Sequence, residues 1–193
     1  MKIQGTVISN IFYPPTAEAA EKKDYDVLWV GGFNNMKCPE KFYQIAKALP
    51  QYRFAMIAKP CPESYLALQE QIQALPNVDY LGTIPFEQTQ SYFNRARLYL
   101  CTSAVEGFPN TFLQSWYARI PVVSVSFPCD GVLERFQCGL LSRTVEKCCN
   151  DISLCLENQQ YCDIMGGNGF EYLEKNHLPP NLLQKMEEFL NKH

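Results

Sequence analysis

Residues 26–49 read DVLWVGGFNNMKCPEKFYQIAKAL, and this stretch decides the fold. The apolar run at residues 27–30 stops at two glycines, which is typical of a buried strand that ends in a loop. Beyond Pro39, apolar residues recur at the spacing of one helix face, at Phe42, Ile45, Ala46 and Leu49. The stretch therefore predicts a strand, a glycine-containing loop and a helix.

The same alternation continues along the chain. Further strands are expected at residues 54–58, 78–81, 98–101, 121–125 and 140–141. Further helices are expected at residues 62–75, 86–95, 110–119 and 132–136, followed by a helical tail over 144–193 with breaks at Gly166-Gly167 and Pro179-Pro180. This order predicts an α/β fold of three layers, a parallel β-sheet of about six strands with helices on both faces. Such sheets bind ligands outside the carboxyl ends of their strands.

Length and composition bound the possible functions. The chain has 193 residues, of which 47% are hydrophobic and 19% charged, with a formal net charge of -3. These values fit one globular domain and exclude a disordered chain. They also argue against a global electrostatic hold on nucleic acid or an anionic membrane. We expect residues 1–24 to form a lead-in segment and residues 25–193 the domain itself.

Nine cysteines are present, an odd number, and no two of them form a Cys-x-x-Cys pair. The first ten residues lack the features of a signal peptide, so a reduced chain in the cytoplasm is expected. Cys148, Cys155 and Cys162 are spaced by seven residues, which favours small buried side chains over metal ligands. No metal-ligand spacing is present, and His177 and His193 are expected at the surface of the tail.

The loop after the first strand contains Gly31, Gly32 and Lys37. Lys37 directly precedes a predicted helix, where a cation opposes the helix dipole unless an anion is nearby. A lysine together with free backbone amides would form a phosphate site. The alternative is an exposed lysine that points to water. The spacing matches neither a P-loop nor the G-x-G-x-x-G pattern.

The loop after the fourth strand contains Glu106 at the carboxyl edge of the sheet, then Gly107. Asn110 and Thr111 open a helix whose first N–H groups are suited to an anion, with Gln114 on its first turn. The alternatives are a capping box formed by Thr111 and Gln114 and a solvated acid at Glu106.

The order of these segments resembles the C-terminal half of a retaining glycosyltransferase of the GT-B fold, in glycosyltransferase family 4 (glycosyl transferases group 1). The resemblance rests on residues 7–10, 28–37, 78–85, 106–110 and 118–123. It implies a Rossmann-like domain that binds a nucleotide-sugar donor, such as a UDP- or GDP-sugar. It further implies transfer of the sugar, with retention, to an acceptor glycan, lipid or other molecule, without a bound metal.

The resemblance also implies roles for single residues. Lys37 would neutralise the donor diphosphate beside Gly31 and Gly32, and Glu106 would contact hydroxyl groups of the donor sugar. The oxygen atoms of the donor sugar and phosphates would bind the loop and the backbone amides between Phe108 and Thr111. The residues of this part of the donor site are Gly107, Phe108, Pro109, Asn110 and Thr111. The nucleobase would lie between Thr83 and Ile84, for which the alternative is a simple turn.

Two positions depart from the family pattern. The family commonly has a second glutamate where this chain has Gln114, and an arginine where it has Gly32. A glutamine can still accept a hydrogen bond from ribose, but the lost arginine removes a bidentate phosphate contact. These departures leave open a non-catalytic binding or assembly module on the same fold. An epimerase-type relative is a further alternative, but it would need a base in the cleft.

The resemblance covers one half of a two-domain enzyme. The acceptor site would lie on an N-terminal domain that this chain does not contain, and any membrane contact would be made through that absent half. A helix over residues 180–192 would pack against the same domain. Its apolar side chains would then be partly exposed here, namely Leu182, Leu183, Met186, Phe189 and Leu190.

Overall fold

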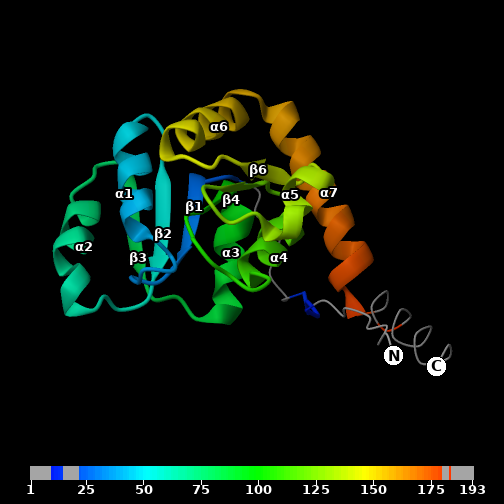
Figure 1. Cartoon of the computed structure of the whole chain (residues 1–193), viewed down its shortest axis with the longest axis horizontal. Helices are drawn as coiled ribbons and strands as arrows, with labels where there is room; N and C mark the ends of the chain where they lie inside the picture. The colour runs from blue at the N-terminus through cyan, green and yellow to red at the C-terminus, as the bar shows by residue number, and fades with distance from the viewer. Residues whose placement is uncertain (1–9, 15–21, 180–182, 184–193) are drawn as a thin grey trace, which may run out of the picture.

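A computed structural model describes residues 10–14, 22–179 and 183 of the chain. Its centre is a parallel sheet with strand order β3-β2-β1-β4-β5-β6, which confirms the predicted architecture (Figure 1). The strands are β1 (Tyr25–Gly31), β2 (Phe54–Ala58), β3 (Val78–Gly82), β4 (Ala96–Cys101), β5 (Val122–Ser124) and β6 (Gly139–Leu141).

The helices of the described part follow the predicted order. They are α1 (Pro39–Ala48), α2 (Leu66–Gln73), α3 (Phe86–Arg95), α4 (Asn110–Tyr117), α5 (Val132–Arg135), α6 (Val145–Glu157) and α7 (Gln159–His177), with 3-10 turns η1 (Glu63–Tyr65) and η2 (Cys129–Gly131). The helix expected at 62–75 therefore begins as a 3-10 turn after Pro62.

Two hydrophobic clusters lie on opposite faces of the sheet. In β2, Phe54 and Met56 point to the cluster that contains side chains of α1, α2 and α6. Ala55 and Ile57 point to the other cluster, with side chains of α3, α4 and α5. Because β2 is buried on both faces, its sequence is a continuous apolar run rather than an alternating one.

Helix α7 does not break at Gly166 and Gly167, as the sequence had suggested, but continues through both. A Cβ atom added at Gly166 would lie 2.0 Å from the Arg119 carbonyl oxygen, and one at Gly169 2.1 Å from the Trp116 ring. These glycines therefore let α7 approach α4 closely.

All nine cysteines lie in the described part and are free thiols. Cys148 and Cys155 on α6 and Cys162 on α7 are buried in one hydrophobic cluster, as expected of small apolar side chains. None of the helices in the described ranges is both long and apolar enough to cross a membrane.

The predicted helix at 180–192 lies almost wholly outside the described residues. Within it the structure describes Leu183, which is 52% exposed, in keeping with the expectation for this side chain. The proposed boundary between a lead-in segment and the domain stays a prediction, since the structure describes only residues 10–14 and 22–24 of the lead-in.

Candidate functional site

The candidate site lies where the strand order of the sheet reverses. β1 is bordered by β2 on one side and by β4 on the other, so the chain leaves β1 in one direction and returns to it through β4. At such a point the chain leaves the two strands toward opposite sides of the sheet, and ligands commonly bind outside the carboxyl ends of these strands. These two loops, at residues 32–38 and 102–109, carry the side chains that the sequence singled out.

Hydrogen bonds join the two loops directly. The Ala104 N–H donates to the Met36 carbonyl at 2.8 Å. The Thr102 hydroxyl donates to the Lys37 carbonyl at 2.6 Å and accepts the indole N–H of Trp29 at 2.8 Å. Because Trp29 belongs to β1 and is buried, these contacts anchor the two loops to the core.

Lys37 and Glu106, the two predicted catalytic residues, form an ion pair between Nζ and Oε1. Their side chains are only 25% and 17% exposed. The same Oε1 accepts the Ser103 hydroxyl at 2.6 Å. Glu106 is therefore fixed in place rather than freely solvated, which the sequence had left open, and its second carboxylate oxygen remains for a further donor.

The backbone before α1 is held by Asn34. Its side-chain oxygen accepts the N–H groups of Met36 at 3.0 Å and Lys37 at 2.9 Å. Cys38 then takes a left-handed conformation, with φ of 49°, and provides no side-chain cap for α1. Backbone strain of this kind is common in loops at functional sites, and it occurs here directly after Lys37.

Gly31 and Gly32 differ in their surroundings. A Cβ atom at Gly31 would lie 2.6 Å from the Trp29 ring, so this glycine is needed for packing. A Cβ atom at Gly32 would meet only the Asn34 amide at 3.5 Å, an ordinary contact. The position where the family has arginine thus has room for a side chain.

Helix α4 opens at the carboxyl edge next to Glu106. Pro109 is its N-cap and supplies no side-chain acceptor, so the N–H groups of Asn110 and Thr111 receive no cap from it. Phe108 and Thr111 are half-buried, and Gly107 is exposed. Uncapped N–H groups at the start of a helix are suited to an anion, and the anion site at this position stays a prediction.

Gln114 is buried and only 3% exposed. Its amide Nε2 donates to the Thr89 hydroxyl at 2.8 Å, and its backbone carbonyl accepts from the Gln90 amide at 3.1 Å. The capping box with Thr111 is therefore wrong, because the side chain joins α4 to α3 instead. The predicted contact of Gln114 with the donor ribose stays a prediction. It concerns only the amide oxygen, because the amide nitrogen donates to Thr89.

Thr83 and Ile84 follow β3 at the same edge of the sheet. Gly82 has φ of 68°, a conformation that favours glycine and turns the chain here. Thr83 is exposed and borders a cavity of about 390 Å³ that is lined by Ala58, Pro60, Cys61, Leu66, Gln69, Tyr80, Gly82 and Thr83. Ile84 lies half-buried against the second hydrophobic cluster. Thr83 therefore borders this cavity and Ile84 does not, and the predicted contact of both residues with a nucleobase stays a prediction.

His177 was expected at the surface, and this is wrong. It is 0% exposed, and its ring lies 4.7 Å from that of Phe108 and 5.4 Å from that of Tyr172. The sequence placed it in the tail but gave no sign that the last turn of α7 returns to the loop after β4. His193 lies outside the described residues.

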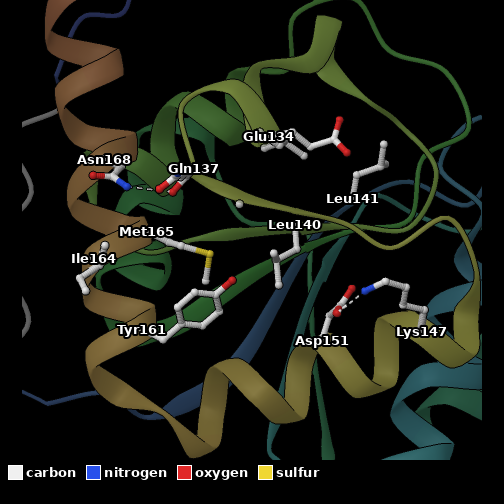
Figure 2. Close-up of a pocket in the computed structure, with 12 residues that line it drawn as sticks. Glu134, Gln137, Leu140, Leu141, Lys147, Asp151, Tyr161, Ile164, Met165 and Asn168 are labelled. Carbon is white, nitrogen blue, oxygen red and sulfur yellow. Dashed lines mark hydrogen bonds and ion pairs between the residues drawn. The ribbon is translucent and has the colours of Figure 1, made fainter.

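A second pocket, of about 260 Å³, lies at the open edge of β6 between α5, α6 and α7 (Figure 2). Tyr161 and Met165 of α7 point toward Leu140 there, and Lys147 pairs with Asp151 at 2.7 Å. None of the predicted site residues lines this pocket.

Within the described ranges, no cluster of three or more His, Cys, Asp or Glu side chains could hold a metal ion. Metal-independent chemistry stays a prediction.

Sequence reasoning missed four residues that shape the site, namely Asn34, Thr102, Ser103 and His177. Ser103 had a local signal, a hydroxyl three residues before Glu106. Asn34 had one as well, since asparagine commonly bonds backbone groups of its own loop. Thr102 and His177 gave none, because their partners lie far away in the sequence.

The family model described as Glycosyl transferases group 1 matches residues 24–158 of the chain. A search of curated proteins found no match. Among solved structures, sucrose-phosphate synthase from Thermosynechococcus elongatus is similar, with a TM-score of 0.74 and 17% identity over 88% of this chain and 45% of that chain.

Two further structures are similar in the same way. A TarM variant from S. aureus, in complex with fondaparinux, alpha-GlcNAc-glycerol and UDP, gives a TM-score of 0.75 with 17% identity over 96% of this chain and 38% of that chain. The C-terminal domain of LpcC, a glycosyl transferase group 1 family protein from Francisella tularensis, gives 0.64 with 14% identity over 88% of this chain and 97% of that chain.

At these identities the likeness concerns the fold. The chain spans less than half of sucrose-phosphate synthase and of TarM, but it covers nearly all of the separate LpcC domain. Its fold is therefore that of one half of a GT-B protein. Since the family model covers more than two thirds of the sequence, the chain belongs to the glycosyl transferases group 1 family.

Proposed function

We propose that this chain is the donor-binding half of a retaining glycosyltransferase and that it binds a nucleotide diphosphate sugar, a UDP-sugar first of all. The observation that carries the proposal is the Lys37–Glu106 ion pair between the loops that follow β1 and β4. It combines a cation suited to a diphosphate with a carboxylate suited to sugar hydroxyls. The UDP bound to the similar protein TarM suggests the first nucleotide to test.

In the proposed reaction, the bond between the anomeric carbon and the diphosphate oxygen breaks, and the acceptor oxygen bonds to that carbon on the same face. The proton of the acceptor hydroxyl group passes to the oxygen of the leaving diphosphate. Negative charge builds on the leaving diphosphate. The Lys37 ammonium group would stabilise this charge, together with the first N–H groups of α4 at Asn110 and Thr111. Interactions that strengthen as this charge develops accelerate the reaction.

Donor binding would require Lys37 to exchange Glu106 for a phosphate oxygen. Glu106 would keep its hydrogen bond from Ser103, so that the carboxylate stays in position for the sugar hydroxyls. Glu106 and a donor phosphate would thus be alternative partners of the same ammonium group. The nucleobase of the donor would lie beside Thr83, next to the cavity that follows β3.

The acceptor and the second domain also belong to this proposal. We infer that the acceptor site is contributed by an N-terminal domain, because this chain spans less than half of the similar proteins sucrose-phosphate synthase and TarM. The nine free thiols accord with work in the cytoplasm.

A binding or assembly module without transfer activity is the second candidate. The observation in its favour is that Gln114 stands where the family has a second glutamate and commits its amide to Thr89. The two candidates differ in one measurement. A parent protein that binds UDP-sugar tightly but neither transfers nor hydrolyses the sugar would support the second candidate.

The test of donor binding is calorimetric titration of the chain with UDP, UDP-glucose, UDP-GlcNAc, GDP and uridine. We expect Lys37→Ala to weaken UDP binding by about 10- to 100-fold, the loss of a charge-assisted bond, and to leave uridine binding within about twofold. Lys47→Ala is the matched control, because it removes the same charge from the opposite end of α1. Equal loss for UDP and uridine would refute the role of Lys37, and no binding of any nucleotide would refute the proposal.

A further inference from the structure

Three segments that are far apart in the sequence meet at Phe108. Asn10 from the N-terminal segment, Phe108 from the loop after β4 and His177 from the end of α7 are in mutual contact. Figure 1 shows the segment 10–14 beside the end of α7. We call this set of three residues the loop clamp.

Hydrogen bonds fix two sides of the loop clamp. The Asn10 amide Nδ2 donates to the Phe108 carbonyl at 3.1 Å. The Asn10 carbonyl lies 2.8 Å from Nδ1 of His177. Because a carbonyl oxygen only accepts, Nδ1 carries the hydrogen in this contact. Asn10 therefore links the imidazole ring to the backbone of the loop.

Ring packing closes the third side. The His177 ring stacks on that of Phe108 with an angle of 35° between the planes. Phe108 in turn lies 6.3 Å from the Trp116 ring of α4. These separations fall in the range in which aromatic pairs stabilise one another. The Phe108 side chain is thus held between α4 and the end of α7.

The N-terminal segment has an anchor of its own. The Phe12 N–H donates to the His177 carbonyl at 2.8 Å, and the buried Phe12 ring lies 5.5 Å from that of Tyr117. Asn10 is therefore positioned independently of the loop that it contacts. The contacts of Phe12 hold the N-terminal segment, and the contact of Asn10 with Phe108 then stabilises the loop.

The loop between Glu106 and Phe108 has little other support on its outer side. Gly107 is exposed, and a Cβ atom there would meet nothing within 4 Å. The inner side is held by Ser103 and Lys37 through Glu106. The loop clamp therefore holds the outer end of the segment that precedes α4.

We propose that Asn10 and His177 are positioning residues for the sugar end of the donor site. The proposal rests on the proposed function, because it assigns the loop at Glu106–Phe108 to the donor sugar. With the loop clamp intact, the backbone of Gly107 and Phe108 keeps one arrangement relative to the Glu106 carboxylate. With it broken, the contacts of the diphosphate with Lys37 and α4 remain, and the contacts of the sugar with this loop weaken.

The first test concerns the loop without any ligand. Asn10→Asp keeps the size of an exposed side chain but replaces the donor to the Phe108 carbonyl by an acceptor. We expect the ¹⁵N order parameters of Gly107 and Phe108 to fall from about 0.85 to below about 0.7, at an unchanged melting temperature. Asn168→Asp is the control, since the half-buried Asn168 amide also donates to a carbonyl at 3.1 Å, that of Gln137, which is not part of the loop.

The second test compares UDP with UDP-glucose and UDP-GlcNAc by calorimetry. The preference is the ratio of the Kd for UDP to the Kd for whichever of the two UDP-sugars binds the native chain more tightly. In Asn10→Asp this ratio should fall by about three- to tenfold, whereas the Kd for UDP itself should stay within about twofold of the native value. His177→Asn keeps a donor for the Asn10 carbonyl, so it should retain more of the preference than His177→Ala.

The outcomes separate the two proposals. Unchanged order parameters in Asn10→Asp would overturn the positioning role whatever the ligand data show. A loosened loop with an unchanged sugar preference would overturn its link to the donor sugar. A chain that binds no nucleotide would refute the proposed function and, with it, the sugar assignment, while the order parameters would still decide whether the loop clamp positions the loop. Should His177→Ala fail to fold, Asn10→Asp carries the test, because Asn10 is exposed.

Discussion

Gly32→Arg should strengthen diphosphate binding, because it restores the arginine that the family resemblance implies at this position. The structure provides room for it. The nearest atom to an added Cβ is the Asn34 amide at 3.5 Å, and the backbone is outside the left-handed region. The substitution should therefore leave the free energy of unfolding within about 1 kcal/mol of the native value.

The expected gain follows from the guanidinium group. A bidentate, charge-assisted contact with phosphate contributes about 3 kcal/mol, and ordering the long side chain costs about 1.5–2 kcal/mol. The net gain of about 1.4 kcal/mol corresponds to a tenfold lower Kd for UDP. Because the contact is partly exposed, the gain should shrink at high salt.

Calorimetric titration with UDP and with uridine checks this prediction. Uridine lacks the diphosphate, so its Kd should change by less than about twofold. Gly32→Gln is the control for length and hydrogen bonding without charge, and it should bring little gain. An unchanged Kd for UDP, or equal gains for UDP and uridine, would contradict the reasoning about the position of Gly32.

Three further predictions concern stability and reactivity. Gly169→Ala should lower the free energy of unfolding by about 1–3 kcal/mol in denaturant titrations, because its Cβ would meet the Trp116 ring, whereas Gly167→Ala has open space and should not. Gln114→Glu should lower the melting temperature by about 2–10 °C in calorimetry, since a carboxylate cannot donate to Thr89, and by more at pH 8 than at pH 5, because burial favours the neutral carboxyl. Mass spectrometry after brief thiol alkylation at pH 8 should find modification at the two half-buried cysteines and little at the seven buried ones; the half-buried pair is Cys61 and Cys149.

The physical cause behind the last of these is burial. It raises the pKa of the thiols at Cys129, Cys138 and Cys148 to about 12. Such groups hold almost no thiolate at pH 8, and the thiolate is the reactive form. Rapid modification of any of the three would show that the corresponding cluster opens.

Much of the fold was predictable because local signals agree with tertiary packing. The strand at residues 54–58 and the helix at residues 86–95 have the predicted bounds, since an apolar run and a periodic pattern each end at a turn signal there. The break expected at Gly166 and Gly167 is wrong for an instructive reason. A glycine disfavours a helix by about 1 kcal/mol, but close packing of α7 on α4 outweighs that preference.

The sequence singled out individual residues of the candidate site, but it did not show which of them contact one another. Lys37 and Glu106 each stood out at the end of a strand, yet their ion pair joins positions 69 residues apart. The topology of the sheet, once known, makes that pairing natural, because their loops follow neighbouring strands. The burial of Gln114 and His177 was not visible, since it depends on α3 and α7 folding against the loop after β4.

Gly32 and Gln114, the two departures from the family pattern, differ in how much room surrounds them. A Cβ atom at Gly32 would make only an ordinary contact with the Asn34 amide, so an arginine fits there without rebuilding the loop. Gln114 is enclosed and hydrogen-bonded to Thr89, so a glutamate there would disturb the contact between α3 and α4. A donor site in this chain must therefore rely on Lys37 and the first turn of α4 for the diphosphate, and on Glu106 for the sugar. The preference for a UDP-sugar over UDP should therefore depend on Glu106. Glu106→Gln should preserve UDP binding, because Lys37 is then released from its carboxylate partner, but it should remove the preference for a UDP-sugar.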